Sequence, residues 1–264
     1  EPSTKAPDPM DIALGAAVRI RRRHDRRIAS HPEHAMRTIL ITGANRGIGL
    51  ALAQQFTARG DRVIGVCRHG SDALAATGAR VEPGIDVTDD GVLAALAQRL
   101  HDVRIDTLVL NAGILARETL GAIDRAGFDS MRRQFEVNAL GPLRVAQALR
   151  DRLADGAKVG IITSRMGSMA DNGSGGSYGY RASKAAVNAI GRSLAVDLKP
   201  RGIAVFLLHP GYVATDMVGG TGDVTPAQAA TGLIARLDTL GLAESGTFWF
   251  LTKIALMVTV LPLT

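Results

Sequence analysis

The 264-residue chain contains one cysteine, Cys67, which excludes a disulfide within a single chain. A lone thiol fits a reducing compartment, and we expect a cytoplasmic protein. No apolar run reaches the roughly 18 residues that a membrane span needs. No basic stripe interleaved with aromatics is present, and the formal charge of +6 comes largely from scattered arginines. These absences argue against a membrane span and against nucleic-acid binding, while an anionic cofactor stays compatible. No metal site is predicted.

Hydrophobic residues make up 46% of the chain and charged residues 21%, which is typical of a globular protein. Residues 1–35 differ from the rest, since they combine a proline-rich start with the arginine-dense RIRRRHDRR. We expect them to be a poorly ordered, non-native leader or an over-extended start, with Met36 as the natural first residue. An arginine-rich targeting peptide is the alternative, and the acidic residues of this segment count against it. The folded domain is predicted over 36–250, followed by an atypically apolar tail over 251–264.

From Arg37 onward, short apolar runs alternate with segments of helical spacing. The predicted strands are 38–42, 62–67, 79–85, 105–110, 158–164, 203–208 and 246–250. The predicted helices follow Gly49 and span 92–100, 128–153 with a bend at Pro142, 178–199, and 225–240. The connections are short and no internal repeat is present. This pattern predicts the α/β class, as a single domain with a doubly wound parallel sheet of about seven strands and helices on both faces.

A glycine-rich loop separates the first strand from the first helix. Gly43, Gly47 and Gly49 form G-x-x-x-G-x-G, which differs by one residue from the usual dinucleotide fingerprint. One glycine permits the sharp turn, one lets the backbone approach a pyrophosphate, and one lets helix and strand pack closely. The helix N-terminus then offers N–H groups and a positive dipole end to phosphates. We therefore predict a dinucleotide site that includes Asn45, Arg46 and Ile48.

The second strand ends Val66-Cys67-Arg68, without the acidic residue that usually binds the ribose 2′-hydroxyl of NAD. Arg68 is placed to bind a 2′-phosphate instead, and Arg46 lies in the neighbouring loop. The alternative is that one or both are solvated surface arginines. We predict a preference for NADPH over NADH.

Tyr180 and Lys184 stand four residues apart in a segment predicted to be helical, so they share one helix face. A nearby ammonium would stabilise a phenolate, which is what proton exchange with an alkoxide at neutral pH requires. The plain alternative is a surface Tyr and Lys on an amphipathic helix. Only Tyr180 has this partner, because Ala182 stands four residues after Tyr178.

Four motifs together resemble the short-chain dehydrogenase/reductase family over about residues 37–250. They are Thr42-Gly43-Ala44-Asn45-Arg46-Gly47-Ile48-Gly49, Asn111-Ala112-Gly113, Tyr180-Arg181-Ala182-Ser183-Lys184 and Pro210-Gly211. The stretch from Ser164 to Arg181 resembles the C-factor and sniffer-type carbonyl reductase branch. The resemblance implies a Rossmann-like fold.

It also implies roles for matching residues. Tyr180 would be the general acid in carbonyl reduction, and Lys184 would lower its pKa and bind the nicotinamide ribose. Ser164 would hydrogen-bond the substrate oxygen, with Ser168 and Thr163 as rival candidates. Asn138 would hold a water that links Lys184 to solvent; the alternative is an Asn at a helix kink.

The remaining implied contacts are with the cofactor. Asn111, with Ala112 and Gly113, would support the sheet and the adenosine side. Asp86, beside Val87, would contact the adenine, or else be only a turn aspartate. The residues implied at the nicotinamide are Pro210, Gly211, Val213 and Thr215.

The resemblance implies an NADPH-dependent oxidoreductase that reduces a ketone or aldehyde, assembled as a homodimer or homotetramer. The alternative is an NAD(P)-binding sensor or signalling protein of the C-factor type with little turnover. The glycine-rich loop Val218–Val224 corresponds to a family loop that closes over substrate, and it carries few side chains that define a pocket. The apolar tail departs from the family.

Overall fold

The computed structural model describes residues 36–251. The expectations for a leader over 1–35 and for the tail beyond Leu251 lie outside the described residues. None of the helices within 36–251 is long and apolar enough to cross a membrane.

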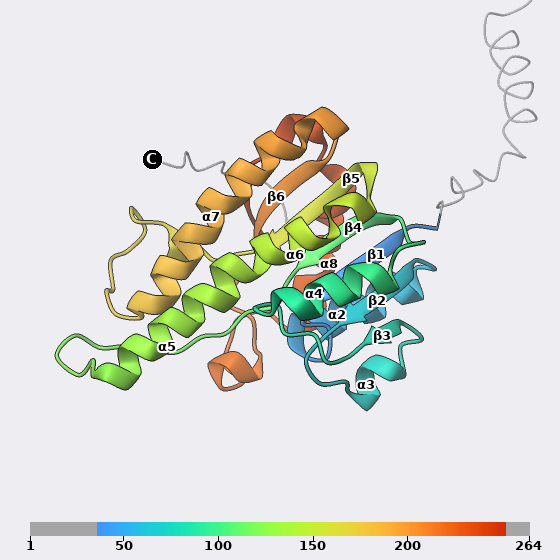
Figure 1. Ribbon diagram of the computed structural model, residues 1–264. Helices are drawn as coiled ribbons and strands as arrows, with labels where there is room; N and C mark the ends of the chain where they lie inside the picture. The colour runs from blue at the N-terminus through green and yellow to red at the C-terminus, as the bar shows by residue number, and fades with distance from the viewer. Residues whose placement is uncertain (1–35, 252–264) are drawn as a thin grey trace, which may run out of the picture. The chain divides into compact units, whose positions relative to one another are not determined.

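Seven parallel strands form one sheet in the order β3-β2-β1-β4-β5-β6-β7 (Figure 1). The strands are β1 (Thr38–Thr42), β2 (Arg62–Val66), β3 (Arg80–Glu82), β4 (Ile105–Leu110), β5 (Leu153–Ile162), β6 (Ala204–His209) and β7 (Thr247–Phe250). In the centre of the sheet Leu40 pairs with Ile64 on one side and Leu108 on the other. The strand order reverses between β1 and β4, and ligands of such sheets bind where this happens, at the carboxyl ends of the strands.

Helices cover both faces of the sheet (Figure 1). They are α2 (Gly47–Ala58), α3 (Asp72–Ala75), α4 (Asp90–Arg99), α5 (Arg125–Phe135), α6 (Gly141–Leu149), α7 (Tyr178–Leu198) and α8 (Pro226–Thr239). Short 3₁₀ turns span Arg150–Arg152, Arg165–Gly167, Lys199–Arg201, Asp216–Val218 and Leu242–Glu244. The predicted fold class is confirmed.

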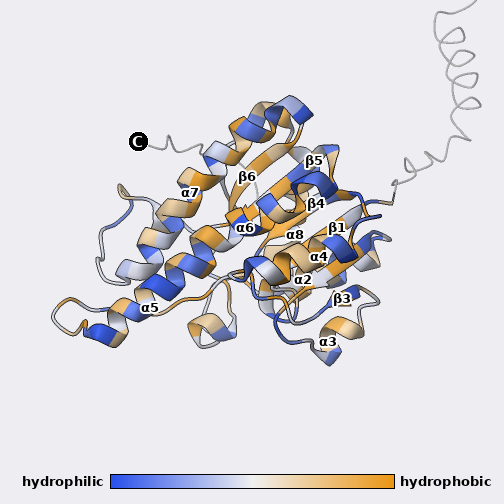
Figure 2. Cartoon of the chain, viewed as in Figure 1, coloured by the Kyte–Doolittle hydropathy of each residue, from blue (hydrophilic) through white to orange (hydrophobic). Residues whose placement is uncertain are grey.

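Alternate residues of the central strands point to opposite faces of the sheet. Leu40 and Leu108 join the core under α4, α6 and α7, while Ile41 and Val109 join the core under α2 and α8. Figure 2 shows these central strands as mostly hydrophobic. Each fully buried side chain of this kind stabilises the fold by about 1.5–3 kcal/mol, so the two cores hold the strand ends in place.

Most predicted elements have the observed type, and α8 begins as expected, with Thr225 as N-cap and Pro226 in the first turn. Several boundaries differ by one to three residues, and two strands differ most. The third strand ends after Glu82, where Pro83 and then Gly84, at φ +78°, break the predicted range 79–85. The fifth strand begins at Leu153, which pairs with Ile105, and it ends two residues before Ser164.

The segment predicted to be helical over 128–153 with a bend at Pro142 is helical, and its regular geometry is interrupted just before Pro142. The chain forms α5, a π-helical turn at Glu136–Leu140, and α6, which ends at Leu149. Pro142 has no N–H to donate to the carbonyl of Asn138, so the regular helical ladder is interrupted here. The π turn places Asn138, which is 1% exposed, against the loop that follows β4.

Candidate active site

A cavity of about 1120 Å³ opens at the carboxyl ends of the strands. The residues just after β1, β4, β5 and β6 all contribute to its wall. The predicted site residues that line it are Gly43, Asn45, Arg46, Gly47, Ile48, Arg68, Asp86, Val87, Asn111, Ala112, Gly113, Ser164, Tyr180, Lys184, Pro210, Gly211, Val213 and Thr215. Gly49, Asn138 and Ser168 do not line it. One cavity of this size accommodates a dinucleotide together with a small substrate.

The glycine loop has the geometry that close approach of a phosphate requires. Gly43 and Gly47 have φ of +68° and +55°, which side chains rarely adopt. A Cβ on Gly49 would lie 2.2 Å from the carbonyl oxygen of Gly43, so this glycine serves helix packing and not the cavity wall. The Asn111 side chain donates to the carbonyl oxygens of Thr42 (3.0 Å) and Gly43 (3.2 Å). Asn111 therefore supports the loop, while its predicted role at the adenosine side stays a prediction.

The N-terminus of α2 suits an anion. Arg46 is the N-cap but forms no side-chain capping bond, and the first turn carries no acidic residue. The leading N–H groups of this 12-residue helix and its positive dipole end therefore face the cavity. The loop and helix together fit the pyrophosphate of a dinucleotide.

The two arginines predicted at the 2′-phosphate are in different states. Arg46 lies 3.5 Å from Asp216, and both side chains are largely exposed, so this pair is weak. The Arg68 side chain is exposed and has no hydrogen-bond or ion-pair partner within residues 36–251. Arg68 is therefore free to bind an anion at this end of the cavity.

Asp86 forms the turn expected of it and also lines the cavity. Its carboxylate accepts from the Thr88 hydroxyl (2.7 Å) and backbone N–H (3.0 Å), and from Arg133 (2.9 Å). Burial raises the pKa of Asp86, but these hydrogen bonds outweigh burial and lower it. The carboxylate stays charged, and its role at the adenine stays a prediction.

Ser164, Tyr180 and Lys184 meet in the inner part of the cavity. Ser164 follows β5, is 8% exposed, and its hydroxyl lies close enough to Tyr180 to lower the pKa of that phenol. Tyr180 and Lys184 lie in the first two turns of α7. The Lys184 Nζ donates to the carbonyl oxygen of Ile162 (2.9 Å) and lies 5.6 Å from the centre of the Tyr180 ring. The predicted Tyr–Lys pair thus shares a helix face.

Burial dominates the electrostatics of this group. It raises the pKa of Tyr180 to about 12, against the opposing hydrogen bond with Ser164. It lowers the pKa of Lys184 to about 8. The predicted lowering of the Tyr180 pKa by Lys184 is therefore not seen in the protein alone, because removing both groups from water disfavours their charged forms. Tyr180 is held as a neutral phenol that carries a proton to give.

The rival hydroxyls are bound to other residues, although Thr163 also lines the cavity. Thr163 is 2% exposed, and its hydroxyl donates to the Asn188 side chain at 2.6 Å. Ser168 does not line the cavity, and its hydroxyl accepts from the N–H of Asp171. Ser164 is the candidate whose hydroxyl reaches Tyr180.

Asn138 lies behind the cavity wall. Its Oδ1 accepts from the N–H of Ile114 (2.8 Å), and its Nδ2 donates to the carbonyl oxygen of Ile114 (2.8 Å) and to the Ser183 hydroxyl (3.1 Å). A Cβ on Gly113 would lie 3.3 Å from Asn138 Oδ1 and 3.9 Å from Lys184 Nζ. Asn138 is therefore next to Lys184 without touching it, and the predicted bridging water stays a prediction.

Sequence reasoning missed several cavity residues, among them His209, Arg117, Arg165, Arg181 and Phe250. His209 ends β6, so the rule that ligands bind beyond carboxyl ends of strands points to it. Burial, and then Arg165, lower its pKa to about 4. The arginines lie in loops or at the start of a helix, and loop residues such as Arg117 carry no periodic signal.

Comparison with known proteins agrees with this geometry. The family described as short chain dehydrogenase matches residues 37–224. The chain belongs to that family. It is therefore an NAD(P)-dependent oxidoreductase acting on CH–OH or C=O groups, and the predicted resemblance is confirmed.

Two relatives of this short-chain dehydrogenase stand out by sequence. The 1-hydroxy-2-glutathionyl-2-methyl-3-butene dehydrogenase of Rhodococcus sp. is 46% identical over 219 residues, which is 81% of this chain and 96% of that protein. The C-signal of Myxococcus xanthus is 44% identical over 160 residues, 60% of this chain and 95% of that protein.

Solved structures of carbonyl reductases share the fold. The carbonyl reductase Sniffer of D. melanogaster superposes with a TM-score of 0.74 at 27% identity, covering 82% of this chain and 97% of that one. The NADPH-bound carbonyl reductase from chicken fatty liver gives 0.73 at 30% identity, covering 82% and 96%.

Proposed function

We propose that this short-chain dehydrogenase reduces a ketone or aldehyde with NADPH, with Tyr180 as the general acid. The observation that carries the proposal is the meeting of Ser164, Tyr180 and Lys184 in the cavity that the glycine loop also lines. A protein that only binds a dinucleotide has no need of this group. The presence of NADPH in a solved relative supports the choice of cofactor.

The residues that would hold the cofactor fit it. The glycine loop and the N-terminus of α2 suit the pyrophosphate, and Arg68 suits a 2′-phosphate. Pro210, Gly211, Val213 and Thr215 line the cavity and would contact the nicotinamide. When bound, NADPH supplies the hydride.

The chain's own residues supply the proton and hold the substrate oxygen. Ser164 and Tyr180 hydroxyls converge, so a carbonyl oxygen placed between them receives two hydrogen bonds. Negative charge that develops on this oxygen is met by the Tyr180 proton, which burial keeps on the phenol until it is needed. The Lys184 ammonium, fixed by Ile162, stabilises the phenolate that remains. The cavity walls exclude bulk water and strengthen these interactions.

The test is NADPH oxidation, followed by absorbance, against a panel of aliphatic and aromatic ketones and aldehydes. Turnover of at least one carbonyl, with loss in Tyr180→Phe, supports the proposal. NADPH binding without turnover across the panel supports the sensor alternative instead.

A second candidate is the reverse reaction, dehydrogenation of an alcohol that bears a glutathionyl group, as the name of the Rhodococcus relative states for that protein. Arg117, Arg165 and Arg181 favour it, since they line the cavity and guanidinium groups suit the carboxylates of a glutathionyl group. Arg165 lies 3.5 Å from Asp171, and Arg181 donates to Ser174, so these two would exchange those partners for the substrate. Assaying NADP⁺ reduction with glutathione-conjugated alcohols distinguishes the two. A homodimer or homotetramer stays our proposal for the assembly, to be tested by sedimentation.

A further inference from the structure

A buried carboxylate lies outside the group that performs the chemistry. Glu118, in the loop between β4 and α5, is 7% exposed. Its Oε1 accepts from Nε2 of Gln134 at 2.6 Å, and its Oε2 accepts from the N–H of Gly179 at 3.1 Å. Its backbone carbonyl accepts from the N–H of Ser177 at 2.9 Å. One residue thus binds the start of α7 through both side chain and backbone.

The hydrogen bonds around Glu118 have a fixed polarity. Gln134 is fully buried, and its Oε1 accepts from the N–H of Ala116 at 2.9 Å. Its amide nitrogen must therefore point at Glu118. The backbone N–H of Gly179 can only donate. Both side-chain oxygens of Glu118 consequently face donors. A carboxylate can accept at both positions, whereas an amide can accept at only one.

This contact replaces the usual cap of α7. Ser177, the N-cap, makes no side-chain capping bond and has φ +50°, the single positive φ of a residue other than glycine within 36–251. The Glu118 carboxylate satisfies a leading N–H and places a negative charge at the positive end of the helix dipole. A Cβ on Gly179 would lie 2.7 Å from Gln134 Nε2, so helix and amide are in close contact. Tyr180 is the next residue.

We propose that Glu118, oriented by Gln134, is a positioning residue that fixes the first turn of α7 and with it the Tyr180 hydroxyl. It acts through the backbone and touches no reacting atom. The inference rests on the proposed function, because it assigns Glu118 an effect on turnover.

The test uses isosteric variants of the full chain. Glu118→Gln sets an amide nitrogen against one of the two donors and shifts the first turn of α7. We expect kcat to fall by about 10- to 100-fold, since misplacing a catalytic group by about 1 Å costs up to roughly 100-fold. NADPH affinity, measured by fluorescence, stays within about twofold because the glycine loop is elsewhere. Amide hydrogen exchange at Gly179, Tyr180 and Arg181 becomes faster.

The double variant Glu118→Gln with Gln134→Glu again gives each hydrogen-bond donor around positions 118 and 134 an acceptor. The carboxylate introduced at position 134 accepts from Ala116 and from the new amide at position 118, whose oxygen accepts from Gly179. We expect kcat and exchange rates to return to within about threefold of the wild type, since all donors regain acceptors. The control is Asp124→Asn, which alters the exposed cap of α5 at Gly127 and leaves kcat unchanged.

Wild-type kcat in Glu118→Gln overturns the inference. So does a fall in NADPH affinity as large as the fall in kcat, which indicates general loss of folding, and so does a double variant no better than the single one. A wild-type protein without any carbonyl turnover contradicts the proposed function instead. Hydrogen exchange at the start of α7 then still decides whether Glu118 fixes that turn.

Discussion

The Lys184 ammonium donates to the carbonyl oxygen of Ile162 at 2.9 Å, which ties the second turn of α7 to the end of β5. Ser164 follows Ile162 by two residues, and Tyr180 precedes Lys184 by one helical turn. The bond therefore fixes the two hydroxyls relative to each other. Because both partners are buried, the same bond helps retain a charge that burial disfavours.

The pH dependence of reduction should follow Lys184. Burial lowers its pKa to about 8, so the cation is present below that pH and is lost above it. Tyr180, with a pKa of about 12, stays protonated throughout. We expect kcat/KM for carbonyl reduction to decline above about pH 8, as a profile of the free enzyme reports. Lys184→Met should lower kcat/KM by about 100-fold or more and abolish the decline above about pH 8. A wild-type profile that is flat to about pH 9.5 contradicts the assignment.

Cofactor choice should depend on Arg68. Arg68→Asp introduces the acidic residue typical of NAD sites and removes the unpaired guanidinium. We expect kcat/KM for NADPH to fall by about 10- to 100-fold, from the loss of about 1.5–3 kcal/mol of charged hydrogen bonding, with no fall for NADH. Arg62→Asp is the matched control, because Arg62 is exposed at the amino end of β2, the strand that Arg68 follows. It should change kcat/KM for neither NADPH nor NADH. Equal wild-type efficiency with both cofactors would show that Arg68 is only a surface arginine.

Acid stability should depend on His209. Burial lowers its pKa from 6.5 to about 4, so the unfolded chain binds a proton before the folded one does. The stability from keeping this ring neutral is complete above pH 6.5 and is lost as the pH falls toward 4. The loss amounts to roughly 3 kcal/mol at most. His209→Phe keeps a ring against Phe250 and should flatten this part of the curve of unfolding free energy against pH. If the free energy of unfolding falls equally in wild type and variant as the pH drops from 6.5 to 4, the lowered pKa of His209 is contradicted.

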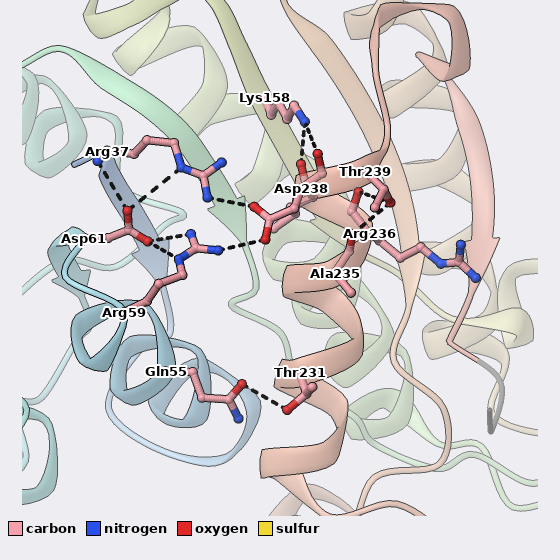
Figure 3. A network of polar contacts seen from close by, with 11 residues as sticks. Arg37, Gln55, Arg59, Asp61, Lys158, Thr231, Ala235, Arg236, Asp238 and Thr239 are labelled. Atoms are coloured by element: carbon pink, nitrogen blue, oxygen red, sulfur yellow. Dashed lines mark hydrogen bonds and ion pairs between the residues drawn. The ribbon is translucent and has the colours of Figure 1, made fainter. Parts of the chain in front are cut away.

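A salt-bridge network at the amino ends of β1 and β2 should affect stability only. Asp238, at the end of α8, accepts from Arg37 at 2.7 Å and Arg59 at 2.8 Å, and both arginines also pair with buried Asp61 (Figure 3). Asp238→Asn weakens two half-buried pairs, so we expect unfolding to become easier by about 1–2 kcal/mol. Asp155→Asn, at an exposed position, is the control and should lower the free energy of unfolding by less. A large loss of kcat at unchanged folding would place this network in the catalytic machinery.

The sequence predicted those elements whose structure depends on residues close together in the chain. The strand 105–110 and the start of α7 at Tyr178 follow from apolar spacing, and the sharp turn at Gly43 follows from glycine. The interruption before Pro142 was predicted from that proline, but its form was not, because the π turn places Asn138 against Ile114, 24 residues away. The contact of Glu118 with Gly179 spans 61 residues and leaves no periodic trace.

The same limit applies to the chemistry of the site. Tyr180 and Lys184 were readable from the sequence, because their spacing forms a motif, and Ser164 was chosen by its place at the end of the predicted fifth strand. Their protonation was not readable, since the Tyr180 pKa is set by burial on all sides and only the packed structure determines burial.

The most direct test of the account is steady-state NADPH oxidation by Tyr180→Phe, with a carbonyl that the wild type reduces. The substitution removes one hydroxyl and leaves the ring in the cavity wall. We predict that NADPH still binds with an affinity within about twofold, while kcat falls by about 100-fold or more through loss of the proton donor. A variant that binds NADPH and turns over at a near-normal rate would contradict it.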